Sequence, residues 1–400
     1  MSADPVKQEK NPELAGFRYL EKFGRLFTHL RGSGTESDKA KNRDLHYDQY
    51  VSLLLLYFFS PTLTSLRGLQ GATGLAKVQQ ATGGGRVSLG SLSEAQAAFD
   101  PELLRPILAD LAERAAPVVN GKEAEALRGL VAVDGTFFRA LPRMAWALWK
   151  EGKKGVKAHV HFDVLKAVPE DATLTPAACS EAAELEKAAK PGRLYVMDRG
   201  YHCHRLFAAI LDAGSSFIAR LKGNAVFTVE RERELTEEAR RAGVVRDVEV
   251  GRLGSDGGAD ELAGKRLRLA WVDTGKDGED GKRIVLLLCT DRLDLEAELV
   301  ALGFRHRWWA ELFFRWLKCI LGCRHLLSNK PDGVAIQIYA ALMASVLVSL
   351  WTNHKPTKRM YEMLCFYFQG FASEEELRRF LLDLDKPKQK KKGKFSSNSS

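Results

Sequence analysis

Three acidic residues, Asp134, Asp198 and Glu311, are the candidates for chemistry in this chain of 400 residues. Each aspartate follows a short apolar run and is followed within two residues by a glycine. This is the pattern of a buried strand that delivers a carboxylate to the edge of a sheet. An aspartate before a glycine is also a common turn former, and that alternative stays open for each aspartate taken alone. The pattern predicts a site only if the three carboxylates meet in the fold.

The segment Phe304–Lys318 predicts an amphipathic helix with one carboxylate in a cationic strip. At 100° per residue, Glu311 shares one face with Arg307, Arg315 and Lys318. An ordinary helix with ion pairs between residues four apart would give the same pattern. The alternative is a metal-assisted phosphate site, in which the glutamate binds the metal and the cations bind phosphates. The opposite face is apolar and predicts a firm anchor in the core: Trp309, Leu312, Phe313, Trp316 and Ile320.

The spacing of Arg307, Glu311 and Lys318, R-(3)-E-(6)-K, resembles the last three letters of the Y-(2)-R-(3)-E-(6)-K signature of the IS4-like DDE transposases. The first letter departs from the signature, because Phe304 stands at the tyrosine position. A phenolic hydroxyl is therefore missing there, while ring stacking or packing remains open.

The two aspartate motifs, Asp134-Gly-Thr and Asp198-Arg-Gly-Tyr, precede the glutamate in the order used by this family. The acids are separated by 64 and 113 positions, and β-type runs fill part of the second interval. The similarity covers roughly residues 15–380. It includes residues 92–99 and 355–381, which look like their counterparts in bacterial IS4-type elements.

This resemblance implies an α/β fold, with a ribonuclease-H-like catalytic core interrupted by a mostly β insertion and preceded by an all-helical domain. It implies that Asp134, Asp198 and Glu311 hold two Mg²⁺ ions, for which Mn²⁺ substitutes. Such an enzyme would cleave the ends of an insertion sequence and join the freed 3′-OH to target DNA. The implied partners are double-stranded DNA, in the form of terminal inverted repeats and target, and a second copy in a synaptic homodimer. A hairpin intermediate at the element end is also suggested.

Two alternatives share these residues. The chain could be an attenuated or inactive DNA-binding remnant of a transposase, with Phe304 as the departure from the motif. It could also be a nuclease of the same fold that cuts without strand transfer, because fold alone does not decide function.

Several further residues are candidates for DNA contacts. Arg307 and Lys318 should grip phosphates beside the cut. Arg315 is either a third phosphate contact or a solvated partner of Glu311. Arg199 and Tyr201 follow Asp198 closely and line the site or support it, and Phe304 could stack. His161 is expected to be a core histidine rather than a ligand.

Hydrophobic periodicity and turn residues predict six stretches along the chain. The first contains helices over Leu14–Leu30, Tyr50–Phe59 and Leu75–Thr82, and another capped by Ser91 or Ser93. Whether these helices read DNA, with Arg67, Lys77 and Arg86 on phosphates, or only pack together stays open. The stretches are 1–128, helical and DNA-binding; 129–222, the first part of the core; 223–300, the β insertion; 301–352, the second part with the Glu311 helix; 353–385, closing helices; and 386–400, a disordered lysine-rich tail.

Composition says less about partners than it first suggests. The net charge is +9, but Lys386–Ser400 holds six lysines without an acid, and the charge without them is +3. The six cysteines are scattered without a paired CxxC spacing, so we expect reduced thiols rather than a zinc site or disulfides. The N-terminus is polar and charged, and the apolar run Ile336–Trp351 is short for a membrane span. We expect a soluble, cytoplasmic, DNA-associated protein without a membrane partner.

The lysine-rich tail can be tested directly. If its lysines bind DNA, deleting residues 386–400 should flatten the salt dependence of binding, by about 0.9 in the slope of log K against log[salt] for each phosphate that the tail neutralises. Fluorescence anisotropy of a labelled duplex between low and moderate salt measures this slope. An unchanged slope would exclude the tail from binding.

Overall fold

The computed structural model describes part of the chain. The expected helix Leu14–Leu30 lies mostly outside it, and only the 3₁₀ turn η1 (Thr28–Leu30) falls within. The lysine-rich tail also lies outside it. The described residues are 26–33, 44–139, 144, 149–150, 153–254, 261–279, 281–323 and 325–385.

Ten strands form one mixed sheet within the described residues, in the order β2-β3-β1-β5-β6-β10-β9-β8-β7, with β4 paired to β3. The α/β class expected from the sequence is confirmed. The strands are β1 (Leu130–Arg139), β2 (Trp149–Lys150), β3 (Lys153–Asp163), β4 (Val168–Pro176), β5 (Leu194–Met197), β6 (Ser216–Arg220), β7 (Phe227–Glu232), β8 (Val244–Leu253), β9 (Leu267–Asp277) and β10 (Arg283–Thr290).

The centre of the sheet joins an antiparallel meander to a parallel pair of strands. β1, β3 and β4 pair antiparallel in turn, whereas β5 and β6 run parallel to β1. Parallel neighbours need crossover connections, and the helices α8 (Glu181–Ala188) and α9 (His204–Asp212) supply them. β4 was not predicted from the sequence.

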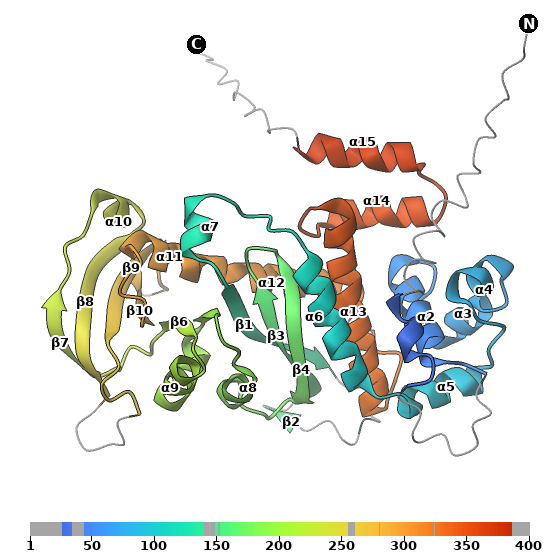
Figure 1. Cartoon of the computed structure of the whole chain (residues 1–400), viewed down its shortest axis with the longest axis horizontal. Helices are drawn as coiled ribbons and strands as arrows, with labels where there is room; N and C mark the ends of the chain where they lie inside the picture. The colour runs from blue at the N-terminus through green and yellow to red at the C-terminus, as the bar shows by residue number, and fades with distance from the viewer. Residues whose placement is uncertain are drawn as a thin grey trace, which may run out of the picture.

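The β-rich stretch extends this sheet instead of forming a sheet of its own. β7, β8, β9 and β10 pair antiparallel, as the sequence predicted, and β10 then pairs antiparallel with β6. Strands from both sides of the expected boundary therefore share one hydrogen-bonded surface (Figure 1). A short helix, α10 (Glu237–Arg241), lies within this stretch.

The N-terminal part is helical, as expected. The predicted helices over Tyr50–Phe59 and Leu75–Thr82 are confirmed; the first begins three residues earlier and the second one residue later than predicted. The predicted cap at Ser91 or Ser93 is wrong, because Ser88 caps the helix and its Oγ accepts the N–H of Ser91 at 2.9 Å. The helices are α2 (Tyr47–Phe59), α3 (Leu66–Ala72), α4 (Ala76–Thr82), α5 (Leu89–Ala98), η2 (Pro101–Leu104), α6 (Arg105–Arg114) and α7 (Lys122–Ala126).

Each face of the central sheet has its own core. Val131 and Val133 point to the side covered by α8 and α9, together with Tyr195 and Met197 of β5. The residues between them point to the opposite side, into the core that contains α6 and the C-terminal helices. Alternation along the strands explains this division. Figure 1 shows α8 and α9 side by side along the central strands.

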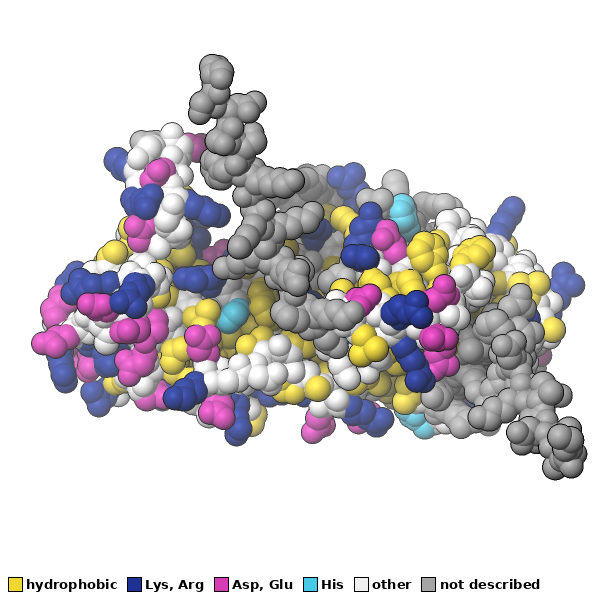
Figure 2. Space-filling view, turned by 90° about the horizontal axis from the view of Figure 1, so that it is seen from above, with side chains coloured by type: hydrophobic (Ala, Val, Ile, Leu, Met, Phe, Trp, Pro, Cys, Tyr) yellow, Lys and Arg dark blue, Asp and Glu magenta, His cyan; other side chains and the backbone are white. Residues whose placement is uncertain are grey.

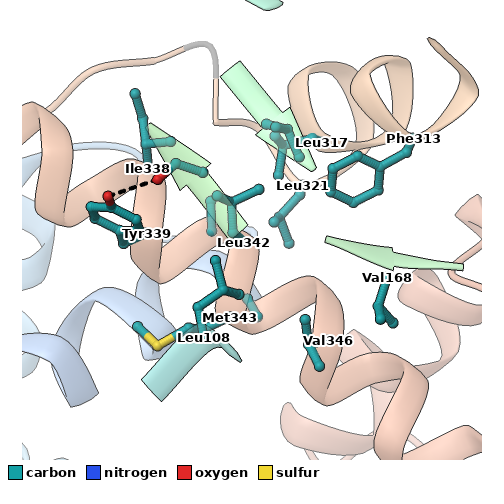
Figure 3. Packing of buried hydrophobic residues seen from close by; sticks show 14 of the residues in the cluster. Leu108, Val168, Phe313, Leu317, Leu321, Ile338, Tyr339, Leu342, Met343 and Val346 are labelled. Carbon is teal, nitrogen blue, oxygen red and sulfur yellow. Dashed lines mark hydrogen bonds between the residues drawn. The ribbon is translucent and has the colours of Figure 1, made fainter. Parts of the chain in front are cut away.

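The helix α13 (Pro331–Thr352) runs through the larger core and is buried nearly all round. It is apolar and long enough for a bilayer span, but 89% of its most apolar window is buried inside this protein. Tyr339 donates a hydrogen bond to the carbonyl oxygen of Ala172 in β4 at 3.0 Å (Figure 3). α14 (Lys358–Phe368) and α15 (Glu374–Asp385) follow as predicted, and Ser373 caps α15.

A buried arginine ties the outer strands to the segment that leads into the Glu311 region. Arg268 of β9 donates two hydrogen bonds to the carboxylate of Asp247 in β8, at 2.6 and 2.7 Å, and a third to the carbonyl oxygen of Leu295. Arg268 and Asp247 are only 1% and 2% exposed. Leu295 lies just before α11 (Ala297–His306). The hydrogen bond from Arg268 to Leu295 therefore ties the segment before α11 to β9.

Replacing Arg268 with methionine should destabilise the protein by about 3–5 kcal/mol, because a buried carboxylate loses its main partner. The matched control is Arg266→Met, which removes an exposed pair with Glu249 and should cost below about 1 kcal/mol. Urea unfolding followed by circular dichroism measures both. Equal costs for the two variants would contradict the structural role of Arg268.

Candidate functional site

Asp134 lies within β1 and not at its end, so the predicted strand-end position is wrong. Asp134 pairs with Val160 of β3, and the pairing continues to Arg139. The following Gly135 is therefore also in the strand, and a simple turn-forming role for this aspartate is excluded. The pairing with β5 stops at Ala132, so beyond that residue β1 has β3 as its strand partner.

Asp198 directly follows β5, as predicted. Ala132 pairs with Val196, so each aspartate lies two residues further along neighbouring parallel strands. Such strands are about 4.8 Å apart. Because side chains alternate, both carboxylates point to the face of the larger core. Asp198 Oδ1 lies 3.4 Å from Nη1 of Arg220 in β6.

The helix predicted over Phe304–Lys318 is interrupted, and the prediction of one continuous helix is wrong. α11 ends at His306, and the N–H groups of Arg307 and Ala310 bond to carbonyl oxygens three residues back. α12 (Trp308–Arg315) carries Glu311 and packs on β1, and the π turn η4 (Trp316–Ile320) follows. The apolar face predicted for the segment does enter the core, through Phe313 and Trp316.

Arg307, and not Arg315, is the partner of Glu311. Arg307 Nη2 lies 2.7 Å from Glu311 Oε1, and its guanidinium lies 5.6 Å from the ring centre of Phe304. Arg307 Nε is buried without a hydrogen-bond partner among the described residues. Arg315 is exposed. The predicted ion pair four residues apart therefore exists, and it leaves a buried donor free beside the carboxylates.

Electrostatics place Asp134 at the centre of the site. Burial raises the pKa of Asp134 to about 6; Arg307 and the Gly135 N–H oppose this shift, and Glu181 and Glu311 add to it. Burial also lowers the pKa of Lys318, which lies near enough to Asp134 to interact with it. Lys318 Nζ is 5.2 Å from the ring centre of Phe138 in β1.

The remaining residues considered as DNA contacts differ in whether solvent reaches them. Arg199 is exposed beside Asp198. Tyr201 is 3% exposed, and burial raises its pKa well above the ordinary value, with Glu181 and Asp134 adding to the shift. Phe304 is 9% exposed and packs in the core. His161 is a core histidine, as predicted, and burial lowers its pKa to about 4.

Glu181, at the start of α8, is a site residue that the sequence did not reveal. Its Oε1 lies 2.9 Å from Nζ of Lys157 in β3, and it influences the pKa of Asp134. In the sequence it is one of several acids in an Ala/Glu/Lys-rich helix, Ser180–Lys190, so no local signal marks it. Only the packing of α8 against β1 and β3 brings it to this place.

The carboxylate oxygens of the site are suitable ligands for a divalent cation, although the three carboxylates do not point to one common position. Among the described residues, no three His, Cys, Asp or Glu side chains are close enough to hold a metal ion. Asp198 and Glu311 are instead paired with arginines. The donors are carboxylate oxygens, which Mg²⁺ prefers, and the raised pKa of Asp134 reflects burial and nearby negative charge that a cation would neutralise.

A cavity of about 1010 Å³ lies away from the three acids. It is lined by Gly129, Asp163 and Arg193, at the opposite ends of the central strands from the acids.

Sequence comparison identifies the family. The profile of the Transposase DDE domain family matches residues 125–347, more than half of the chain, and this region contains all three acids. The chain belongs to the DDE transposase domain family.

Two curated relatives are named as transposases. The DDE-family chain is 31% identical over 207 residues to y4zB of Sinorhizobium fredii (strain NBRC 101917 / NGR234), covering 51% of this chain and 56% of that protein. It is 24% identical over 224 residues to a protein of Geobacillus stearothermophilus named for insertion sequence element IS5377, covering 56% of each. The chain thus spans about half the length of these relatives.

Among solved structures, the chain is similar to the piggyBac transposase synaptic complex with hairpin DNA, with 13% identity and a TM-score of 0.42. The alignment covers 96% of this chain and 84% of that one. A TM-score below 0.5 does not establish a shared fold, so the family assignment rests on the sequence match.

The raised pKa of Asp134 gives a pH-dependent stability. Because the carboxyl is more easily protonated in the folded state, its contribution is fully present below about pH 4 and is lost as the pH rises through about 6. In the presence of a chelator, Asp134→Asn should therefore be more stable than the wild type at pH 7, by about 1–3 kcal/mol. Urea unfolding at several pH values measures the difference.

The same two proteins at pH 4 serve as the control, because the carboxyl is then largely protonated in the folded state and the advantage of asparagine should shrink. A stability difference that stays constant between pH 4 and pH 7 would show that burial does not perturb Asp134.

Proposed function

We propose that this chain is the DNA transposase of an insertion sequence. It binds the terminal inverted repeats, cleaves the element ends and joins the 3′-OH to target DNA by two-metal phosphoryl transfer. The observation that carries the proposal is the strand register, which sets Asp134 and Asp198 on neighbouring strands beneath the helix of Glu311, inside the region that matches the DDE family.

The three carboxylates would hold two Mg²⁺ ions, with Mn²⁺ as a substitute. When bound, the ions would stabilise charge on the attacking and leaving oxygens and lower the pKa of a water. Asp134 is the residue best placed to be shared, because it is adjacent to both other acids. Asp198 and Glu311 would first have to leave Arg220 and Arg307.

The released Arg307 would then be free for the DNA. Its Nε is already buried without a partner among the described residues, and a guanidinium binds phosphate oxygens in a bidentate manner. Lys318, in the π turn, interacts with Asp134 and would supply a second cation for the phosphate backbone. Arg199 and Arg315 are exposed and suit outer phosphate contacts.

Phe304 and Tyr201 are better assigned to the frame of the site than to DNA. Both are buried, Phe304 beside the Arg307 guanidinium and Tyr201 close to Asp134 and Glu181. We therefore propose that their rings position the charged groups, and that stacking on DNA bases is not their role.

We further propose that β4-β3-β1-β5-β6 with α8, α9 and α12 is a ribonuclease-H-like core of the IS4 type, and that β7–β10 is the insertion that widens its sheet. The expected boundaries, 1–128, 129–222, 223–300, 301–352, 353–385 and 386–400, are kept as this proposal. The protein would act in the cytoplasm as a homodimer that pairs two element ends.

The β7–β10 end is a weak candidate for reading the element ends. Figure 2 shows acidic and basic side chains interspersed at this end of the molecule. Several of its arginines are paired with acids, as in Arg246 with Glu232 and Arg283 with Asp273. Binding to the DNA backbone requires positive charge that is not already neutralised. We propose that the N-terminal helices, which expose Arg67 and Arg86, contact the ends instead.

The decisive experiment uses the DNA that flanks the gene. Purified protein, this fragment and a target plasmid are incubated with Mg²⁺ or with EDTA, and the products are sequenced. We expect joined ends with Mg²⁺ only. Asp134→Asn, Asp198→Asn and Glu311→Gln should each lower cleavage by at least about a hundredfold, because each removes a metal ligand, while binding of the ends persists.

Asp110→Asn, on the surface of α6, is the matched control and should cleave normally. Full cleavage by any one of the three site variants would contradict the metal-site assignment. Cut ends without joined products would favour a nuclease, and binding without cleavage would favour an inactive remnant.

A further inference from the structure

Glu181 is wedged between the two segments that carry the aspartates. A Cβ atom added to Gly135 would lie 2.4 Å from Glu181 Oε1, and a Cβ added to Gly200 would lie 3.9 Å from Glu181 Oε2. Gly135 follows Asp134, and Gly200 lies two residues after Asp198. The glycine at 135 is therefore required for the carboxylate to approach the backbone of β1 so closely.

Lys157 of β3 forms an ion pair with the Glu181 carboxylate. Lys157 Nζ lies 2.9 Å from Glu181 Oε1, and the side chain of Lys157 is only 8% exposed, against 25% for Glu181. Lys157 lies opposite Phe137 in the pairing of β1 with β3. The ion pair thus sits on the face of the sheet covered by α8, behind Asp134.

A partly buried ion pair such as Lys157–Glu181 contributes little to the stability of a fold. Burying two charges costs desolvation that their attraction repays poorly, and an apolar pair of similar size is often as stable or more stable. The position also adds negative charge near Asp134 and Tyr201, which is unfavourable for a fold that binds no cation there. Both arguments favour a role for the charge of Glu181.

We propose that Glu181 is a fourth carboxylate of the site: a positioning residue whose negative charge, behind the Asp134 and Asp198 segments, raises their affinity for divalent cations, and that Lys157 partly neutralises this charge. This inference rests on the proposed two-metal function. Glu181 acts through the aspartates, because it approaches the Gly135 and Gly200 backbone from the α8 side of the sheet.

The role is tested by the binding of Mn²⁺ to the full chain without DNA, measured by isothermal titration calorimetry. Glu181→Gln should weaken Mn²⁺ binding by about tenfold, the lower end of the losses seen when supporting residues around a metal are removed. Glu186→Gln is the matched control: it lies on the same helix, pairs with Arg205 at the surface and should leave the affinity unchanged.

Lys157→Gln separates charge from packing. It removes the partner that neutralises Glu181, so the proposal expects Mn²⁺ to bind several-fold more tightly than in the wild type. A purely structural ion pair would give weaker binding in both variants, because the same frame would be loosened from either side. Circular dichroism and the thermal midpoint of each variant establish that the comparison is made between folded proteins.

Opposite changes in the two variants would support the proposal. Weaker binding in both, or no change in Glu181→Gln while the wild type binds Mn²⁺, would overturn it and leave the proposed transposase function standing. Absence of Mn²⁺ binding by the wild type would overturn the metal-dependent function and this inference together.

Discussion

Burial of the Asp134 carboxylate among other charged groups is the constraint on which the rest of this site depends. Burial raises the pKa of Asp134, and the negative charges of Glu181 and Glu311 add to this shift, whereas Arg307 opposes it. Nearby cations hold the arrangement together, Arg307 on Glu311 and Lys157 on Glu181. Close negative charges in a buried site are electrostatically unfavourable. A bound divalent cation would neutralise them most directly.

Carboxylates that repel one another stay close only if the elements that carry them are rigidly packed. Contacts on both sides of the site provide this rigidity. The parallel pairing of β1 with β5 sets the spacing of the aspartates, and the buried helix α13 fixes the meander through the bond from Tyr339 to Ala172. On the other side, the buried Arg268 ties the segment that leads into α11 and α12 to β9. None of these contacts touches the carboxylates, yet each determines where one of them lies.

Local patterns predicted most elements near the site, and the failures have physical causes. Apolar runs revealed β5 before Asp198, and β-type runs revealed the stretch that contains β7–β10. β4 was missed because its buried acid Asp171 and its prolines do not look like a strand, and only the distant partners Arg105 and Lys190 make that acid tolerable. The interruption of the Glu311 helix was missed because 3₁₀ and π turns follow packing, which residue periodicity does not express.

The sequence by itself determined the three acids, their order and the R-(3)-E-(6)-K spacing, because these are properties of residue type and of short segments. Tertiary structure alone decided that β10 pairs with β6, that Arg307 neutralises Glu311, and that Glu181 reaches Gly135. Glu181 and Gly135 are joined by packing across a sheet edge, between residues far apart in the chain. Hydrophobic periodicity reports which face of an element is buried, but it does not report which other element covers that face.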